Sequence, residues 1–292
     1  MTIRLIQLPY DSGHRAKRMG YGPLHLVRAG AQARLARYAP TSLVTIETSA
    51  SFPTEIGTAF ELHRALAVAV SEAIGQEALP LVLSGNCNAS LGTVAGIQGA
   101  DSAGHVGVVW FDGHGESNTP ETFTGTFLDA MGLSTLTGRC WQALANTVPG
   151  FHPVPDENTL LIGAHGADAG ALSVLAGSRI GLVPTAVLHA SGPAQALAPV
   201  FDRLNMQGVR RLYLHLDVDV MDARYAAANE FARDDGLLPD QLAECVNELL
   251  ARFDIAAAGV ASYDPAFDKQ GLVCEAAIRF LEAVARDRFV GK

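Results

Sequence analysis

Short apolar runs alternate along the chain with longer segments in which apolar residues recur every three or four positions. Runs of the first kind are typical of buried strands, and segments of the second kind are typical of helices that pack on a sheet. Strands are expected at residues 3–8, 43–46, 80–84, 106–111, 160–163, 180–183, 211–216 and 256–261. Helices are expected at 24–38, 55–74, on either side of 180–183, at 239–253 and at 271–286.

The alternation of strands and helices predicts an α/β protein with a mostly parallel sheet that is covered by helices on both faces. No linker, repeat or low-complexity tract divides the sequence, so we expect a single domain over residues 1–292. Ligands of such sheets bind outside the carboxyl ends of the strands, and the loops that follow the strands should therefore form one functional rim.

Polar residues gather where the strand at 106–111 ends. Asp112, His114 and Glu116 follow it at alternate positions, with a glycine between each pair. Alternate side chains of an extended segment point to the same side, so these three are expected to converge. Carboxylate and imidazole groups together can hold a divalent cation. A polar turn alone would explain one such cluster.

A second cluster follows the strand at 211–216 and favours a metal site. Asp217 and Asp219 again stand at alternate positions. Two neighbouring carboxylates repel each other unless a cation or a shared proton lies between them. The alternative is a solvated acidic turn, or a local turn capped by Asp222. His215, within the strand itself, is interpreted as a packed core residue.

Composition and charge narrow the function classes. The net charge of −9 and the lack of a basic cluster argue against a nucleic-acid partner. No apolar run is long enough to span a membrane, so no membrane partner is expected. The N-terminal residues lack the features of a signal peptide, and the four cysteines contain no CxxC pair. These features predict reduced thiols and a cytoplasmic protein.

Three motifs resemble those of the arginase family of ureohydrolases. They are Ser84-Gly-Asn-Cys87-Asn-Ala-Ser-Leu-Gly92, then Asp112-Gly-His114-Gly-Glu116 followed by Asn118-Thr-Pro-Glu-Thr, and last Asp217-Val-Asp219-Val-Met-Asp222. The resemblance covers essentially the whole chain. It implies the three-layer α/β/α arginase/deacetylase fold and two Mn²⁺ ions per chain. It also implies a metal-bridging hydroxide that attacks a guanidine carbon and releases urea or a hydroxyurea-type product plus an amine.

The metal ligands that the resemblance implies are only partly kept. One site is complete, with the ligands Asp112, His114, Asp217 and Asp219. At the other site, Cys87 stands in place of a His and Glu116 in place of an Asp. A free cysteine is commonly a small buried hydrophobe, but a nearby cation lowers a thiol pKa, and we interpret Cys87 as a thiolate ligand. Its softer sulfur makes Zn²⁺ an alternative to Mn²⁺.

The remaining site residues follow from the same resemblance. Asp129 stands where the family has a proton-shuttling His, and Ser262 where it has a Glu that holds the guanidinium. Asn118 and Asp168 match positions that bind the carboxylate and the ammonium group of an amino acid. Glu116 is left as the best candidate for proton transfer to the departing amine, with Asp129 as the second.

The sequence thus predicts a binuclear metal-dependent amidinohydrolase that acts on a guanidino or modified guanidino small molecule, and it leaves a homo-oligomer open. The first alternative is a catalytically silent or one-metal relative with a structural or regulatory role. The second is a one-metal hydrolase of the deacetylase type. That class needs paired histidines near the metal, and the sequence has no His-His pair.

Overall fold

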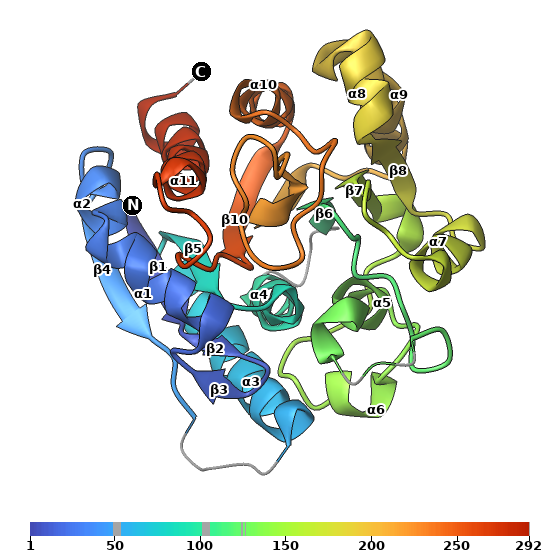
Figure 1. The fold of residues 1–292 in the computed structure, drawn as a ribbon. Helices are drawn as coiled ribbons and strands as arrows, with labels where there is room; N and C mark the ends of the chain where they lie inside the picture. Colours follow the sequence, from blue (N-terminus) through green and yellow to red (C-terminus); the bar gives the residue numbers. More distant parts are fainter. Residues whose placement is uncertain (49–53, 101–105, 124, 126, 292) are drawn as a thin grey trace.

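The computed structural model describes residues 1–48, 54–100, 106–123, 125 and 127–291. Its strands are β1 Thr2–Leu8, β2 Tyr10–Asp11, β3 His14–Arg15, β4 Thr41–Thr45, β5 Ala78–Ser84, β6 Val106–Asp112, β7 Thr159–Gly163, β8 Gly181–Pro184, β9 Arg211–Asp217 and β10 Asp254–Ala261. Within the described residues, eight of them form one sheet in the order β4-β1-β5-β10-β9-β6-β7-β8, and neighbouring strands run parallel (Figure 1). Strands β2 and β3 form a separate antiparallel hairpin.

Helices cover both faces of this sheet (Figure 1). One layer contains α1 Gly22–Arg28, α2 Ala31–Leu35, α8 Thr185–Ser191, α9 Pro193–Met206, α10 Pro239–Leu250 and α11 Leu272–Val290. The other contains α3 Glu55–Gly75, α4 Ser90–Ala100, α5 Gly132–Leu136, α6 Gln142–Ala145 and α7 Ala169–Ala176. Short 3-10 turns are η1 Arg18–Tyr21, η2 Cys87–Ala89, η3 Leu128–Met131, η4 Asp156–Asn158 and η5 Val218–Val220. The predicted three-layer α/β/α fold with a parallel sheet is confirmed.

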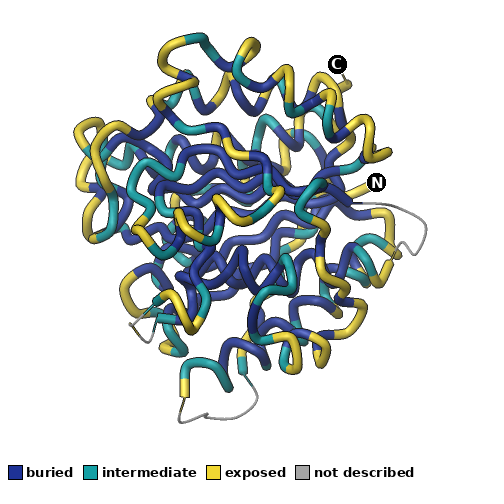
Figure 2. Tube along the Cα trace, turned by 90° about the vertical axis from the view of Figure 1, so that its right-hand side faces the viewer, coloured by how far each residue is buried: buried dark blue, intermediate teal, exposed yellow. Residues whose placement is uncertain are grey.

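The pleat of the central strands divides the core into two apolar layers. In β6, Val108 and Trp110 face the α3–α7 layer, and Val109 and Phe111 face the other helices. All four side chains are fully buried, as is most of the sheet (Figure 2). Burial on both faces explains why the strands form continuous apolar runs in the sequence. The same pleat turns Asp112 towards the side of Trp110, two residues before it.

Two expectations about helices need correction. The helix expected at 24–38 is two helices, α1 and α2, because Gly30 between them has a φ of +98° that ends the first one. The helix α4 was not expected, since its eleven residues include three glycines and no regular polar face. Its glycines bring it against α3: a Cβ at Gly92 would lie 2.6 Å from the carbonyl oxygen of His63.

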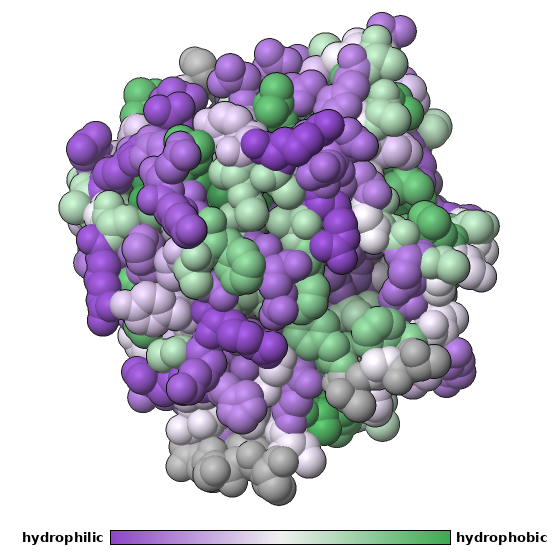
Figure 3. Space-filling model, viewed as in Figure 1, coloured by the Kyte–Doolittle hydropathy of each residue, from purple (hydrophilic) through white to green (hydrophobic). Residues whose placement is uncertain are grey.

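No helix among the described residues is long and apolar enough to cross a membrane. The face in Figure 3 is a mosaic of hydrophilic and hydrophobic side chains. The loops after β5, β6, β7, β9 and β10 meet at the carboxyl edge of the sheet, as predicted, and they carry the candidate site. A single domain over the whole chain stays a prediction.

Candidate metal centre

The end of β6 brings three candidate ligands together through a turn. One oxygen each of Asp112 and Glu116 and a ring nitrogen of His114 lie within 4.8 Å of one another. The predicted convergence is therefore confirmed, but the extended backbone that we expected is wrong. Gly115 and Glu116 have φ values of +87° and +44°, and the Asp112 side chain accepts hydrogen bonds from the backbone N–H groups of His114 and Gly115.

The end of β9 also turns instead of continuing as a strand. Asp219 lies in η5, and its backbone N–H donates to Asp217 Oδ1 over 2.9 Å. The Asp219 side chain contacts His114 Nδ1 at 3.2 Å and accepts a hydrogen bond from the Gly113 N–H at 3.1 Å. The two acidic strand ends therefore meet directly across neighbouring strands of the sheet.

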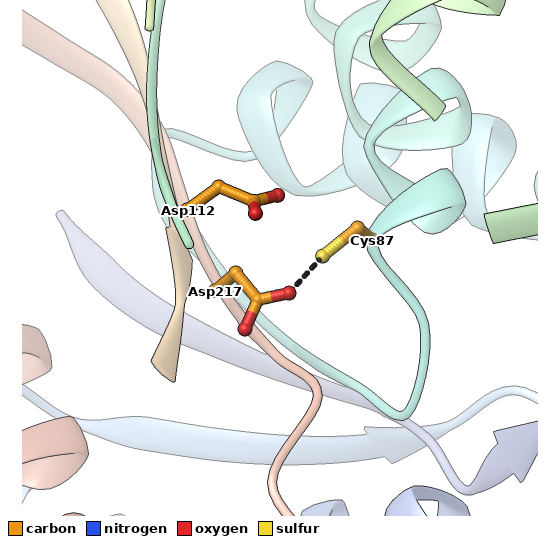
Figure 4. A group of neighbouring side chains, drawn as sticks. All are labelled: Cys87, Asp112 and Asp217. Atoms are coloured by element: carbon orange, nitrogen blue, oxygen red, sulfur yellow. Dashed lines mark hydrogen bonds between the residues drawn. The ribbon is translucent and has the colours of Figure 1, made fainter. Parts of the chain in front are cut away.

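Cys87 reaches the same place from the turn between β5 and α4. Its Sγ donates to Asp217 Oδ2 over 2.9 Å and lies 3.3 Å from Ser262 Oγ. Candidate ligand atoms of Cys87, Asp112 and Asp217 all lie within 4.8 Å of one another, and Figure 4 shows these side chains pointing toward a common centre. All three are buried.

The cluster concentrates negative charge in a buried place. Burial raises the pKa of Asp112 to about 6, with the neighbouring Asp219 adding to the effect. Burial and nearby carboxylates also raise the pKa values of Glu116, Asp217 and the Cys87 thiol well above their usual range. These groups therefore lack a sufficient positive charge from the protein itself, and a divalent cation would supply it. The donor set fits a metal.

One ion pair within the cluster behaves differently. Burial alone would lower the pKa of His114 and raise that of Asp219. Their contact outweighs both effects, so the pKa of His114 rises to about 9 and that of Asp219 falls below its usual range.

Asp129 is engaged in hydrogen bonds. Its Oδ2 accepts from the Cys87 backbone N–H at 2.9 Å and from Asn86 Nδ2 at 3.0 Å, and its Oδ1 accepts from the Asn88 N–H at 2.7 Å. Burial raises its pKa to about 7, against the opposing effect of these donors. Asp129 thus holds the turn that carries Cys87. Thr124 and Thr126, in the segment that precedes it, lie outside the described residues.

Asn118 and Asp168 lie together at the side of the site. Asn118 Nδ2 donates to Asp168 Oδ2 over 3.1 Å, and Asp168 Oδ1 caps α7 by accepting from the Ala171 N–H at 2.8 Å. A cavity of about 280 Å³ opens in front of them. Eight of the ten predicted site residues line it, namely His114, Glu116, Asn118, Asp129, Asp168, Asp217, Asp219 and Ser262. The other two, Cys87 and Asp112, are completely buried.

The structure adds residues that the sequence did not indicate. Asn229 donates from Nδ2 to the Ser262 carbonyl oxygen at 2.8 Å and to Asp219 Oδ2 at 3.3 Å, and thereby ties the loop after β9 to the end of β10. Phe127 and Phe231 stack with ring centroids 5.7 Å apart and line the cavity. No motif marks these residues, and only their position in loops that follow strands could have suggested them.

Aromatic side chains of the sheet, Trp110 and His215, pack beneath the ligand cluster on the side of the core. Trp110 Nε1 donates to Asp112 Oδ2 over 2.7 Å, and the Trp110 ring packs on His215 at 4.0 Å between centroids. His215 is 1% exposed, which confirms its interpretation as a core residue. Asp222 accepts from the backbone N–H and the side chain of Arg224, so its role as a local cap is also confirmed.

The fold and the donor cluster define an α/β protein with a candidate metal centre at the carboxyl edge of its sheet. The model of the Arginase family matches residues 1–285. The chain therefore belongs to the Arginase family, a family of hydrolases.

Individual relatives agree with this assignment. The chain is 27% identical to the arginase of Bacillus subtilis (strain 168) over 235 residues, which are 76% of each chain. It is 26% identical to the arginase of Brevibacillus brevis over 304 residues, or 99% of each chain. The crystal structure of arginase from Bacillus subtilis subsp. subtilis str. 168 superposes with a TM-score of 0.88 at 23% identity, covering 98% of both chains. This structural likeness confirms the fold that the resemblance implied.

Proposed function

We propose that this protein is a binuclear metal-dependent amidinohydrolase. The observation that carries the proposal is a pair of ligand groups that share one carboxylate: Cys87, Asp112 and Asp217 form one, and Asp112, His114 and Glu116 form the other. Glu116 is thus grouped with His114, whereas the resemblance implied that it belongs to the site of Cys87. Asp219 lies beside His114 and would complete the set. Mn²⁺ suits the oxygen and imidazole donors, with Zn²⁺ as the alternative because of the thiolate. Two such cations, when bound by these residues, would lower the pKa of a coordinated water molecule, which would serve as the nucleophile.

The chain's own residues would transfer the proton and bind the substrate. Glu116 lines the cavity and lies next to Asp112, and these positions support a role in which it would pass a proton to the departing amine. Asp129 is a weaker candidate because three N–H groups already bind its oxygens. Asn118 and Asp168 stand in the cavity wall, where they would hold the amino-acid end of a substrate.

Ser262 affects which kind of guanidino group the site is expected to prefer. Where the resemblance implies a carboxylate, this buried residue offers a hydroxyl 3.3 Å from Cys87 Sγ. A guanidinium would lose a charge-assisted hydrogen bond there, worth about 1.5–3 kcal/mol, or roughly ten- to a hundred-fold in affinity. A less basic guanidine loses less because more of it is neutral near pH 7. We therefore propose that a modified guanidine such as Nω-hydroxy-L-arginine is hydrolysed faster than L-arginine.

The test compares kcat/KM for these two compounds with the Mn²⁺-loaded protein. Release of hydroxyurea, with kcat/KM about ten-fold or more above that for urea release from L-arginine, is expected. Equal values, or an advantage for L-arginine, would refute the substrate proposal but leave the reaction class standing. Metal-loaded protein that hydrolyses neither compound, nor any member of a guanidino panel, would favour the catalytically silent alternative.

A further inference from the structure

Arg233 gives the cavity a permanent positive charge. It lies in the segment between η5 and α10 and is the one Arg or Lys among the described residues that line the cavity. The acids that line the same cavity are Glu116, Asp129, Asp168, Asp217 and Asp219. An exposed cation at the rim of such a cavity can attract and orient an anionic group of a ligand.

The guanidinium of Arg233 has no carboxylate partner among the described residues. Within them, it donates only to the carbonyl oxygen of Ala232, from Nη1 over 3.2 Å. Arg224 in the same segment is instead paired with Asp222 at 2.6 Å and with Asp235 at 2.7 Å. Most of the N–H donors of Arg233 are therefore left for a ligand, in the planar arrangement that matches a carboxylate.

A glycine makes room for this side chain beside the metal centre. A Cβ at Gly166 would lie 2.9 Å from Arg233 Cγ and 3.4 Å from His114 Cδ2. Gly166 precedes Asp168 by two residues in the loop after β7, and Arg233, Gly166 and Asp168 all line the cavity. Their charges are opposite, as are those of the ammonium and carboxylate groups on the α-carbon of an amino acid.

We propose that Arg233 binds the α-carboxylate of the substrate and makes the cavity select guanidino amino acids over guanidino compounds without a carboxylate. Arg233 was not indicated by the sequence motifs, which placed the amino-acid end at Asn118 and Asp168 alone. The assignment rests on the proposed function, because it concerns the substrate class of the same cavity.

The direct test combines a residue change with a substrate change. Arg233→Gln should raise KM for Nω-hydroxy-L-arginine roughly ten- to a hundred-fold, because one charge-assisted contact is lost, while kcat stays within a few-fold. The same variant should leave KM for Nω-hydroxyagmatine, which lacks the carboxylate, nearly unchanged. Arg233→Lys should recover part of the loss. Arg224→Gln is the matched control and should alter neither substrate, since Arg224 does not line the cavity.

An equal rise in KM for both substrates would overturn the proposal, since the contribution of Arg233 would then not depend on the carboxylate. No change for either substrate would overturn it as well.

A binding measurement separates these outcomes from a failure of the proposed reaction. L-Ornithine should bind the native protein more tightly than 1,4-diaminobutane, and Arg233→Gln should remove that preference in calorimetry. If no guanidino compound is hydrolysed but this preference is found, the reaction fails and the Arg233 assignment stands. A missing preference, or no ornithine binding, refutes the assignment.

Discussion

The replacement Asp129→Asn distinguishes two possible roles of this carboxyl group, which are proton transfer to the product and stabilisation of the turn that carries Cys87. Proton transfer would require a free carboxyl in the cavity. The structure instead shows both oxygens accepting hydrogen bonds, from the backbone N–H groups of Cys87 and Asn88 and from Asn86 Nδ2. We expect Asp129 to act mainly by fixing the turn that presents Cys87.

The expected magnitude follows from these three bonds. An asparagine keeps one acceptor oxygen and puts an NH₂ group where the other oxygen was, so at least one of the three donors loses its partner. A charge-assisted hydrogen bond contributes about 1.5–3 kcal/mol. The free energy of unfolding should fall by about this amount. If the loss falls on the turn itself, affinity for the metal at Cys87 should drop roughly ten- to a hundred-fold.

Metal content, stability and turnover must be measured on the same preparations. At limiting Mn²⁺, Asp129→Asn should hold close to one metal per chain, and its urea midpoint should be lower than that of the native protein. At saturating Mn²⁺, kcat should return to within a few-fold of the native value. Asp168→Asn is a suitable control for metal content, because the hydrogen bonds described for Asp168 join it to Ala171 at the start of α7 and to Asn118. A collapse of kcat at full metal occupancy, with unchanged stability, would show that Asp129 carries the proton.

Three further changes test the other parts of the site and fold. Cys87→Ala should reduce the metal content from two per chain towards one, and an unchanged count in elemental analysis would sink its assignment as a ligand. Glu116→Gln should lower turnover by orders of magnitude at saturating metal, whereas turnover within a few-fold would move proton transfer elsewhere. Burial lowers the pKa of His63 to about 4 from 6.5, so the unfolded chain binds the extra proton and stability should fall as pH drops from 6.5 to 4. This group contributes a slope of about 1.4 kcal/mol per pH unit at most, and urea titrations of His63→Gln should show a slope that is smaller by this contribution.

The sequence was sufficient for the sheet because its strands are buried on both faces. Such strands appear as apolar runs whatever their neighbours are, and the ends of β6 and β9 were predicted to within one residue. The local backbone after them was not predictable by alternation. Asp112 accepts hydrogen bonds from the N–H groups of His114 and Gly115, and Gly115 adopts a positive φ. The side chain that starts the motif therefore bends the chain away from the extended form.

Long-range contacts account for what the sequence missed at the site. Asp129 binds a turn more than forty positions earlier, and Asn229 joins Asp219 to the carbonyl oxygen of Ser262. The resemblance indicated Asp129 but not its partners, and no motif indicated Asn229, because the fold alone brings these partners close. Arg233 is a similar case: its significance comes from the acids around the cavity and from the lack of a carboxylate partner among the described residues.

Cys87 and Ser262 show why two departures from the family pattern form one local change. The resemblance implies a His at the first position and a Glu at the second, both larger than the residues here. In this chain Sγ and Oγ lie 3.3 Å apart, and both side chains are buried, at 0% and 3% exposure. Protein interiors are closely packed, so a larger group at either position would press on the other. Cys87 affects the choice of metal, and Ser262 affects the choice of guanidine. Because their side chains touch, a small residue at one position favours a small residue at the other.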